Sequence, residues 1–295
     1  MTNSETGCIA NCAFCPQART SQSSPGLLSR IGWPKFEFDQ VLNKLDLGND
    51  FERICIQSLN YRSVVDDVEQ ITKMVKKKIS RPISTCIHPI SIEEMQRLKN
   101  AGITNIGIAV DACTPELFDE IKGKSRHGPY RWDRHMVAIS DAVKVFGEGN
   151  ATTHLIVGLG ETEKEAAEFL FTMAEKDIKV ALFAFTGVKG TALEEQKQPM
   201  LDVYRRLQIL RYLLTDGKIL RSQVNFDKDG VIKFNVDIEL LKQILSAGTA
   251  FQTSGCVGCN RPYYNERPRG PMYNYPHSLS PDEVSTILGN LFSDA

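Results

Sequence analysis

The sequence predicts an α/β fold: a full or partial (β/α)8 barrel of the TIM type, followed by a C-terminal extension that contains cysteine. Three observations support this prediction. Short apolar runs alternate with segments of helical periodicity through the middle of the chain. The alternation repeats at least five times, and strands linked by helices form parallel sheets. It weakens after about residue 225, before a stretch rich in glycine, proline, tyrosine and arginine over residues 248–277.

The predicted strands are short runs of β-branched and other apolar residues. They cover residues 52–58, 83–87, 105–111, 153–160 and 179–186. The predicted helices that follow them cover residues 64–79, 91–102, 114–123, 163–177 and 201–217. Helix ends carry the expected signals: Ser91 and Glu94 form a capping box, Gly102 ends the same helix, and Pro115 lies in a first turn.

We expect two parts in the chain. Residues 1–235 form the barrel, and residues 236–295 form an extension whose cysteine pair closes the barrel mouth. A last helix over residues 280–292 follows Ser280, a residue type that caps helix N-termini. Only seven residues precede Cys8, where a barrel needs its first strand. Either that strand is very short, the barrel is incomplete, or the chain lacks a few N-terminal residues.

Composition narrows the class of protein. The formal net charge is −1, which gives no reason to expect nucleic acid or an anionic membrane as a partner. No apolar run approaches the ~20 residues that a membrane span needs, and the N-terminus lacks a signal-peptide core. We therefore expect a cytoplasmic protein. In that compartment its eight cysteines are expected to be metal ligands or catalytic thiols rather than disulfides.

Three of these cysteines lie close together in "TGCIANCAFCPQART", residues 6–20. They are Cys8, Cys12 and Cys15, with Phe14 before the last. Thiolates bind iron–sulfur clusters, zinc or copper(I). Three ligands would leave one iron of a four-iron cluster open to a small molecule. A zinc site completed by a distant residue, or a redox thiol cluster, is the alternative.

This loop resembles the signature of the radical S-adenosylmethionine (radical SAM) superfamily. The resemblance implies a [4Fe–4S] cluster whose open iron chelates S-adenosylmethionine. "THLIVGLGE" resembles the family's strand against the adenine, which assigns cofactor contacts to Ile156, Gly158 and Glu161. Asp111 corresponds to a position near the ribose and methionine. The chain departs from the family at residues 57–60, "QSLN", where Gly-Gly-Glu often holds the methionine amine.

Within the superfamily, residues 6 to about 215 are similar to biotin synthase, which has an auxiliary iron–sulfur cluster as its sulfur donor. Cys55 and Cys86 match two of its cluster ligands, but Thr152 stands where a third would be. The extension offers Cys256 and Cys259 instead. Four thiolates would close an auxiliary [4Fe–4S] cluster. Cys113 would then be left over and could pack as a small apolar side chain.

This combination most resembles one half of the two-protein lipoyl synthases. The resemblance implies sulfur insertion at C6 or C8 of an octanoyl chain on a lipoyl carrier domain. Implied partners are that octanoylated carrier, the other lipoyl synthase component, and an electron donor such as ferredoxin or flavodoxin. Alternatives are biotin synthase, a related radical mutase or maturase without sulfur insertion, and a zinc- or cluster-binding scaffold without catalysis.

Overall fold

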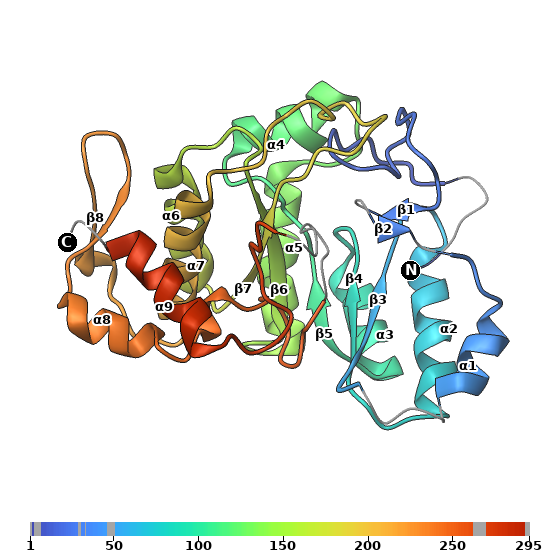
Figure 1. Cartoon of the computed structure of the whole chain (residues 1–295). Helices are drawn as coiled ribbons and strands as arrows, with labels where there is room; N and C mark the ends of the chain where they lie inside the picture. The colour runs from blue at the N-terminus through green and yellow to red at the C-terminus, as the bar shows by residue number, and fades with distance from the viewer. Residues whose placement is uncertain are drawn as a thin grey trace.

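The computed structural model describes residue 2 and residues 7–28, 31–32, 34–45, 51–261 and 270–292. Its centre is a five-stranded parallel sheet in the order β3-β4-β5-β6-β7 (Figure 1). The strands are β3 (Ile54–Gln57), β4 (Ile83–Cys86), β5 (Ile103–Gly107), β6 (Ala151–Val157) and β7 (Lys179–Ala184). The predicted α/β fold is confirmed, and within the described residues these strands form an open sheet.

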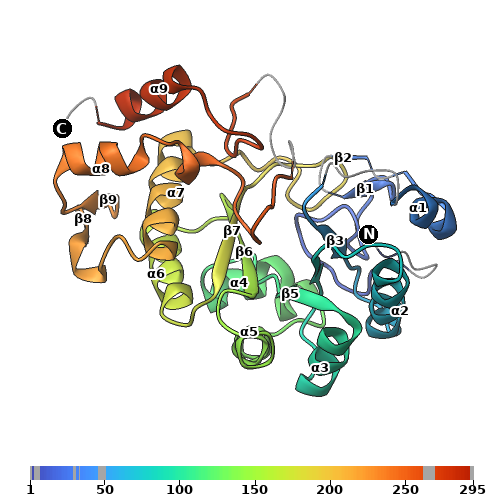
Figure 2. The same ribbon diagram turned by 90° about the horizontal axis from the view of Figure 1, so that it is seen from below.

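Helices connect the strands and cover the convex side of the curved sheet (Figure 2). They are α2 (Val64–Lys76), α3 (Ile92–Ala101), α4 (Pro115–Lys122), α5 (Trp132–Phe146), α6 (Glu163–Ala174) and α7 (Leu201–Thr215). Their apolar faces pack on the sheet, where Leu98, Ile106 and Leu155 are fully buried. Burying one such side chain contributes about 1.5–3 kcal/mol. The concave side of the sheet is therefore left free of these helices and available for function.

Side chains on the concave side come from alternate positions of each strand. Parallel pairing aligns one residue from each of the five strands in a single row across the sheet. The row consists of Gln57, Cys86, Gly107, Thr152 and Lys179. Cys86 and Thr152 thus stand on either side of a glycine, and the middle of the row has space above it.

The predicted strands and helices are present, with ends that differ by a few residues. The capping box of Ser91 and Glu94 and the left-handed Gly102 are also confirmed. The prediction missed α5, because the connection from β5 to β6 carries two helices and α4 already supplies the expected one. It also missed α1 (Phe38–Leu45), α8 (Ile238–Leu245) and the hairpins β1 (Leu27–Leu28)–β2 (Ile31–Gly32) and β8 (Val224–Phe226)–β9 (Ile232–Phe234).

The C-terminal extension is attached to α7 and to the sheet. Buried Arg205 and Gln208 of α7 donate hydrogen bonds to the Tyr273 carbonyl, at 2.6 and 2.8 Å. Ser254 Oγ accepts from the Leu182 amide of β7 at 2.9 Å. The extension runs from α8 past the concave side to α9 (Pro281–Phe292) (Figure 1). These contacts fix the segment that carries the second cysteine pair. The boundary at residue 235 stays a prediction.

Among the described residues, no helix is both long and apolar enough to cross a membrane.

Candidate functional site

The three-cysteine loop is fixed by backbone hydrogen bonds to the carboxyl ends of neighbouring strands and helices. The Ile9 amide donates to the Asn60 carbonyl at 2.9 Å, and the Ala13 amide donates to the Ile121 carbonyl at 2.8 Å. The Asn60 amide also points at Cys8 Sγ, 3.4 Å away. Parallel strands deliver their functional loops at this edge of the sheet. The loop therefore presents its thiols where ligands of such folds bind.

Two side chains hold the loop in shape. Asn11 is buried, donates to the Arg126 carbonyl at 2.8 Å and accepts from the Thr20 hydroxyl at 2.7 Å. Phe14 packs against a small apolar cluster that includes Leu159 and Phe185. The aromatic residue before the third cysteine is thus a packing anchor, and Asn11 closes the loop on itself.

Burial favours the neutral thiol at Cys12 and Cys15 of this loop. Burial raises the pKa of Cys12 well above its usual range and that of Cys15 to about 12. Burial also raises the pKa of Cys86 well above its usual range, and it raises the pKa of Cys256. Metal ligation requires thiolates, so binding iron here displaces protons.

Asp111 lies at the carboxyl end of the sheet, in a left-handed backbone conformation with φ of 69°. Its amide donates to the His154 carbonyl and its carbonyl accepts from the Ile156 amide, both at 2.9 Å. Its carboxylate forms a 2.6 Å ion pair with Lys122. Burial lowers the pKa of Lys122, but the negative charge of Asp111 and its hydrogen bond act against burial, and the net shift is upward, so the ammonium stays charged.

The predicted adenine strand ends in a tight turn held by Glu161. The Glu161 carboxylate accepts hydrogen bonds from the amides of Gly158, Leu159 and Gly160. Gly158 has φ of 102°, and a Cβ there would lie 2.8 Å from Pro199 Cδ. The close backbone approach predicted at Gly158 is thus to another segment of the chain. The cofactor contacts of Gly158 and Glu161 stay predictions.

Two cavities lie on the concave side of the sheet. The first, which we call the apolar chamber, has a volume of about 500 Å³. It lies at the carboxyl ends of the strands and touches Cys15, Asp111 and Ile156. Phe14, Leu28, Ile31, Phe183 and Phe185 supply much of its wall. Two predicted cofactor residues therefore share a largely apolar space with Cys15 of the three-cysteine loop and with three cysteines predicted for the auxiliary cluster, Cys55, Cys86 and Cys259.

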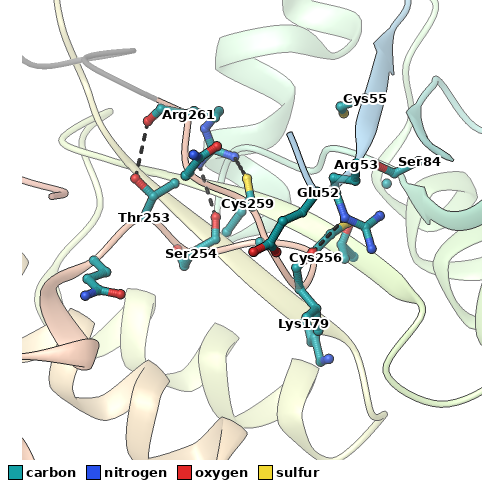
Figure 3. Close-up of a pocket in the computed structure, with 18 of the residues that line it drawn as sticks. Glu52, Arg53, Cys55, Ser84, Lys179, Thr253, Ser254, Cys256, Cys259 and Arg261 are labelled. Atoms are coloured by element: carbon teal, nitrogen blue, oxygen red, sulfur yellow. Dashed lines mark hydrogen bonds between the residues drawn. The ribbon is translucent and has the colours of Figure 1, made fainter. Parts of the chain in front are cut away.

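The second, which we call the wide cavity, has a volume of about 770 Å³. Its wall contains Cys55 and Cys86 from the strands and Cys256 and Cys259 from the extension. Figure 3 shows Cys55, Cys256 and Cys259 around this space. The structure thus brings all four cysteines predicted for an auxiliary cluster to one cavity.

The extension cysteines sit on a short loop with several anchors. The Cys259 amide donates to the Cys256 carbonyl at 2.9 Å, and Arg53 donates to the Val257 carbonyl at 2.7 Å (Figure 3). Arg261 donates to Cys259 Sγ at 3.3 Å and to the Ser254 carbonyl at 3.2 Å. Arg53 comes directly before β3, so this loop lies at the amino ends of the strands.

Cations outnumber carboxylates in the wall of the wide cavity. The cations are Arg53, Lys179, Arg211 and Arg261, and the carboxylates are Glu52 and Asp216. Asp216 pairs with Lys218 at 2.9 Å. Burial lowers the pKa of Arg211 to about 10, which still leaves it charged at neutral pH. A surplus of positive charge beside four thiols suits an anionic occupant.

The four cysteines of the wide cavity are the number of thiolates that closes a four-iron cluster. Within the described residues, no group of three or more His, Cys, Asp or Glu side chains is placed to hold one metal ion. In a four-iron cluster each thiolate binds a different iron, so the sulfurs stand farther apart than around one zinc. Cys55, Cys86, Cys256 and Cys259 all line one cavity, so they can serve one occupant.

Sequence analysis did not identify several residues that lie at the site. His154 lies between both cavities, with Nε2 3.9 Å from Cys86 Sγ. Lys122 had the pattern of a solvated helix end, yet it is buried. Asn60 belongs to residues 57–60, the segment that departs from the family pattern. Its backbone amide lies 3.4 Å from Cys8 Sγ. Cys113 is buried in the core, as expected for an apolar side chain.

An α/β sheet with three cysteines on a loop at its carboxyl edge defines a class of proteins that bind an iron–sulfur cluster there. The model of the family "Radical SAM superfamily" matches residues 3–173. That match covers more than half of the chain, and the chain belongs to this superfamily.

Individual relatives are distant. A biotin synthase of Synechococcus sp. (strain RCC307) is 23% identical over 227 residues, which is 73% of this chain and 66% of that protein. The chain thus spans slightly under two thirds of that relative. Methylornithine synthase (PylB) has a similar structure, with a TM-score of 0.57, 16% identity and coverage of 73% of this chain and 61% of that one. The FeFe-hydrogenase maturase HydG from Carboxydothermus hydrogenoformans is also similar in structure, with a TM-score of 0.56 and 14% sequence identity. The match covers 72% of this chain and 50% of that one.

The superfamily implies a [4Fe–4S] cluster and S-adenosylmethionine. Cys8, Cys12 and Cys15 are the residues that would hold this cluster. The observed site fits both groups, since it offers three thiols on one loop and a chamber that touches Cys15, Asp111 and Ile156.

Proposed function

We propose that this chain inserts sulfur into an unactivated C–H bond of a carrier-bound octanoyl chain. The reaction would be one of the two insertions, at C6 or C8, that make the lipoyl cofactor. The observation that carries the proposal is the meeting of Cys55, Cys86, Cys256 and Cys259 at one cavity.

The two cavities are adjacent. Their walls share Cys55, Gln57, Cys86, His154, Cys259 and Arg261. An auxiliary cluster held by the four thiols would therefore border the apolar chamber. Because its sulfide enters the product, this cluster is a second substrate. Its position beside the chamber supports direct transfer of sulfur to a molecule bound there.

The apolar chamber matches the chemistry of the acyl chain. The rings of Phe183 and Phe185 and the side chains of Leu28, Ile31 and Ile156 offer an eight-carbon alkyl chain an apolar contact surface. When bound at the three-cysteine loop, the cluster and S-adenosylmethionine supply a 5′-deoxyadenosyl radical that removes hydrogen from carbon. The chain's own residues position the C–H bond and exclude water.

Asp111, Ile156 and the loop thiols are assigned to cofactor binding under this proposal. Asp111 lines the chamber while Lys122 holds its carboxylate in place. The partners follow from the reaction: an octanoylated carrier, the other lipoyl synthase component, and a one-electron donor such as ferredoxin or flavodoxin.

Mass spectrometry of a thiolated product tests the proposal. The reconstituted protein is incubated anaerobically with S-adenosylmethionine, a reductant and an octanoyl-lysine peptide. We expect the peptide to gain one sulfur atom. Cys86→Ala should keep S-adenosylmethionine cleavage and lose sulfur transfer, whereas the matched Cys113→Ala keeps both. Cleavage without sulfur transfer by the wild type, with the partner component present, would refute the proposal.

Two other functions have specific support. The relatives named biotin synthase favour sulfur insertion in biotin synthesis, but Thr152 stands in the cavity wall where that resemblance places a thiolate ligand. The structural likeness to methylornithine synthase favours a rearrangement without sulfur. That function needs no second cluster, so it leaves the four cavity cysteines without a role.

A further inference from the structure

The two cavities share the wall around Cys86 and His154 and extend from there toward opposite ends of the strands. The apolar chamber touches Phe185 and Thr186, which follow β7. The wide cavity touches Lys179, the first residue of the same strand, and Arg53, which precedes β3. The four cavity thiols therefore have one side toward the chamber and another side toward the amino ends of the strands.

The amino-end side is exposed to solvent. Cys55, on the edge strand β3, is exposed, and Glu52 and Gly258 at the rim are exposed as well. Val257, between the extension cysteines, is 74% exposed. A small molecule can thus approach the cavity at this end without passing Cys15 or Asp111.

Two cations in the wall of this cavity, Lys179 and Arg211, form no direct ion pair among the described residues, although Asp216 lies near enough to Arg211 to offset part of the lowering of its pKa by burial. Lys179 forms no side-chain hydrogen bond or ion pair there. Arg211 has its Nε buried without a hydrogen-bond partner. A buried polar atom without a hydrogen-bond partner costs free energy, and an anion bound beside Arg211 would offset that cost. Uncompensated positive charge in a cleft also raises the local concentration of anions.

We propose that the wide cavity is a separate anion route to the sulfur donor, in which Lys179 and Arg211 guide small anions such as hydrosulfide to the four thiols from the amino ends of the strands. This inference rests on the proposed function, because it takes those thiols as the auxiliary cluster site. A cluster that is consumed must be supplied again. A separate route allows that supply while S-adenosylmethionine and substrate occupy the chamber.

Iron release to chelators tests the route. Protein loaded with both clusters is treated anaerobically with EDTA, which is anionic, or with neutral 2,2′-bipyridine. Each reaction is run with and without saturating S-adenosylmethionine and octanoyl-lysine peptide. Iron of the three-cysteine loop is measured separately in Cys256→Ala/Cys259→Ala. We expect EDTA to remove auxiliary iron at the same rate whether or not the chamber is filled.

Charge reversal at the rim gives the second readout. Lys179→Glu should slow removal of auxiliary iron by EDTA about three- to tenfold and leave the rate with bipyridine unchanged. The matched control Lys176→Glu changes the same charge at an exposed position outside the cavity wall and should have no effect. Arg211→Gln provides an independent variant, with a smaller effect in the same direction.

The failure of this inference and that of the proposed function give different results. If about eight irons load but S-adenosylmethionine blocks EDTA from the auxiliary iron, the separate route is wrong and sulfur insertion stands. Equal rates of auxiliary iron removal by EDTA in Lys179→Glu, Arg211→Gln and wild type would also overturn the separate route. If only about four irons load, both proposals fail.

Discussion

Lys122 Nζ lies 2.6 Å from Asp111 Oδ2, and the two side chains are only 4% and 8% exposed. The ammonium also donates to the Ala109 carbonyl at 2.8 Å and lies 4.9 Å from the centre of the Tyr130 ring. A buried ion pair holds its members in place, because neither charge can leave the other without entering an apolar interior. Lys122 is thus the positioning residue for Asp111.

Breaking this pair should destabilise the protein. Lys122→Met leaves the Asp111 carboxylate buried without its partner, which we expect to cost about 3–5 kcal/mol of unfolding free energy. Adding Asp111→Asn should recover part of that loss, since asparagine removes the charge and tolerates the left-handed backbone. Denaturant unfolding measures both variants. A loss no greater than that of the exposed Lys124→Met would contradict the buried-pair account.

Gly107 controls the space beside Cys86. A Cβ at this position would lie 3.0 Å from Thr152 Oγ1 and 3.6 Å from Cys86 Sγ. Thr152 Oγ1 donates to the Ile106 carbonyl at 3.3 Å, so it has limited freedom to move away. We expect Gly107→Ala to displace Cys86 and to lower auxiliary iron while the iron of the three-cysteine loop remains. Iron analysis after reconstitution measures the change.

The control for this substitution is Gly289→Ala in α9, where nothing lies within 4 Å of the added Cβ. That variant should load iron like the wild type. Full auxiliary iron in Gly107→Ala would show that Cys86 does not depend on the space beside it.

His135 should make the fold sensitive to acid. It is 1% exposed and packs edge-on against Phe118 and Tyr130. Burial lowers its pKa from 6.5 to about 3. Above pH 6.5 both folded and unfolded chains carry the neutral ring. Below it the unfolded chain takes up a proton that the folded chain does not, so stability falls as pH drops from 6.5 toward 3.

At pH 5 this proton uptake should cost about 2 kcal/mol relative to neutral pH. Denaturant unfolding of the metal-free chain at pH 7 and pH 5 measures the difference. His135→Gln should lose that part of the pH dependence, and the exposed His277→Gln should keep it. An unchanged pH dependence in His135→Gln would contradict the assignment.

The sequence predicted the sheet because its strands and helices carry local signals that need no tertiary information. The capping box at Ser91 and the proline at residue 115 are such signals. The close spacing of Cys8, Cys12 and Cys15 is also a local signal, and it identified the three-cysteine loop. That Cys55, Cys86, Cys256 and Cys259 line one cavity was expected only through resemblance to a family, since no local pattern links residues so far apart.

Contacts created by folding were beyond prediction. Lys122 stands in the last turn of a helix, where lysine is usually solvated, and only the turn after β5 brings Asp111 to it. Gly158 looked like a site of close ligand approach, but its space is taken by Pro199, 41 residues later in the chain. His154 and Arg211 face the cavities because of strand register and helix packing, which composition does not reveal.

The central claim is a sacrificial auxiliary cluster held by cysteines from both the sheet and the extension. Iron and acid-labile sulfide per chain, measured after anaerobic reconstitution of the wild type and of Cys256→Ala/Cys259→Ala, test it most directly. The account predicts about eight irons in the wild type and a fall toward about four in the double variant. About four irons in both proteins would contradict it and favour a radical enzyme without sulfur insertion.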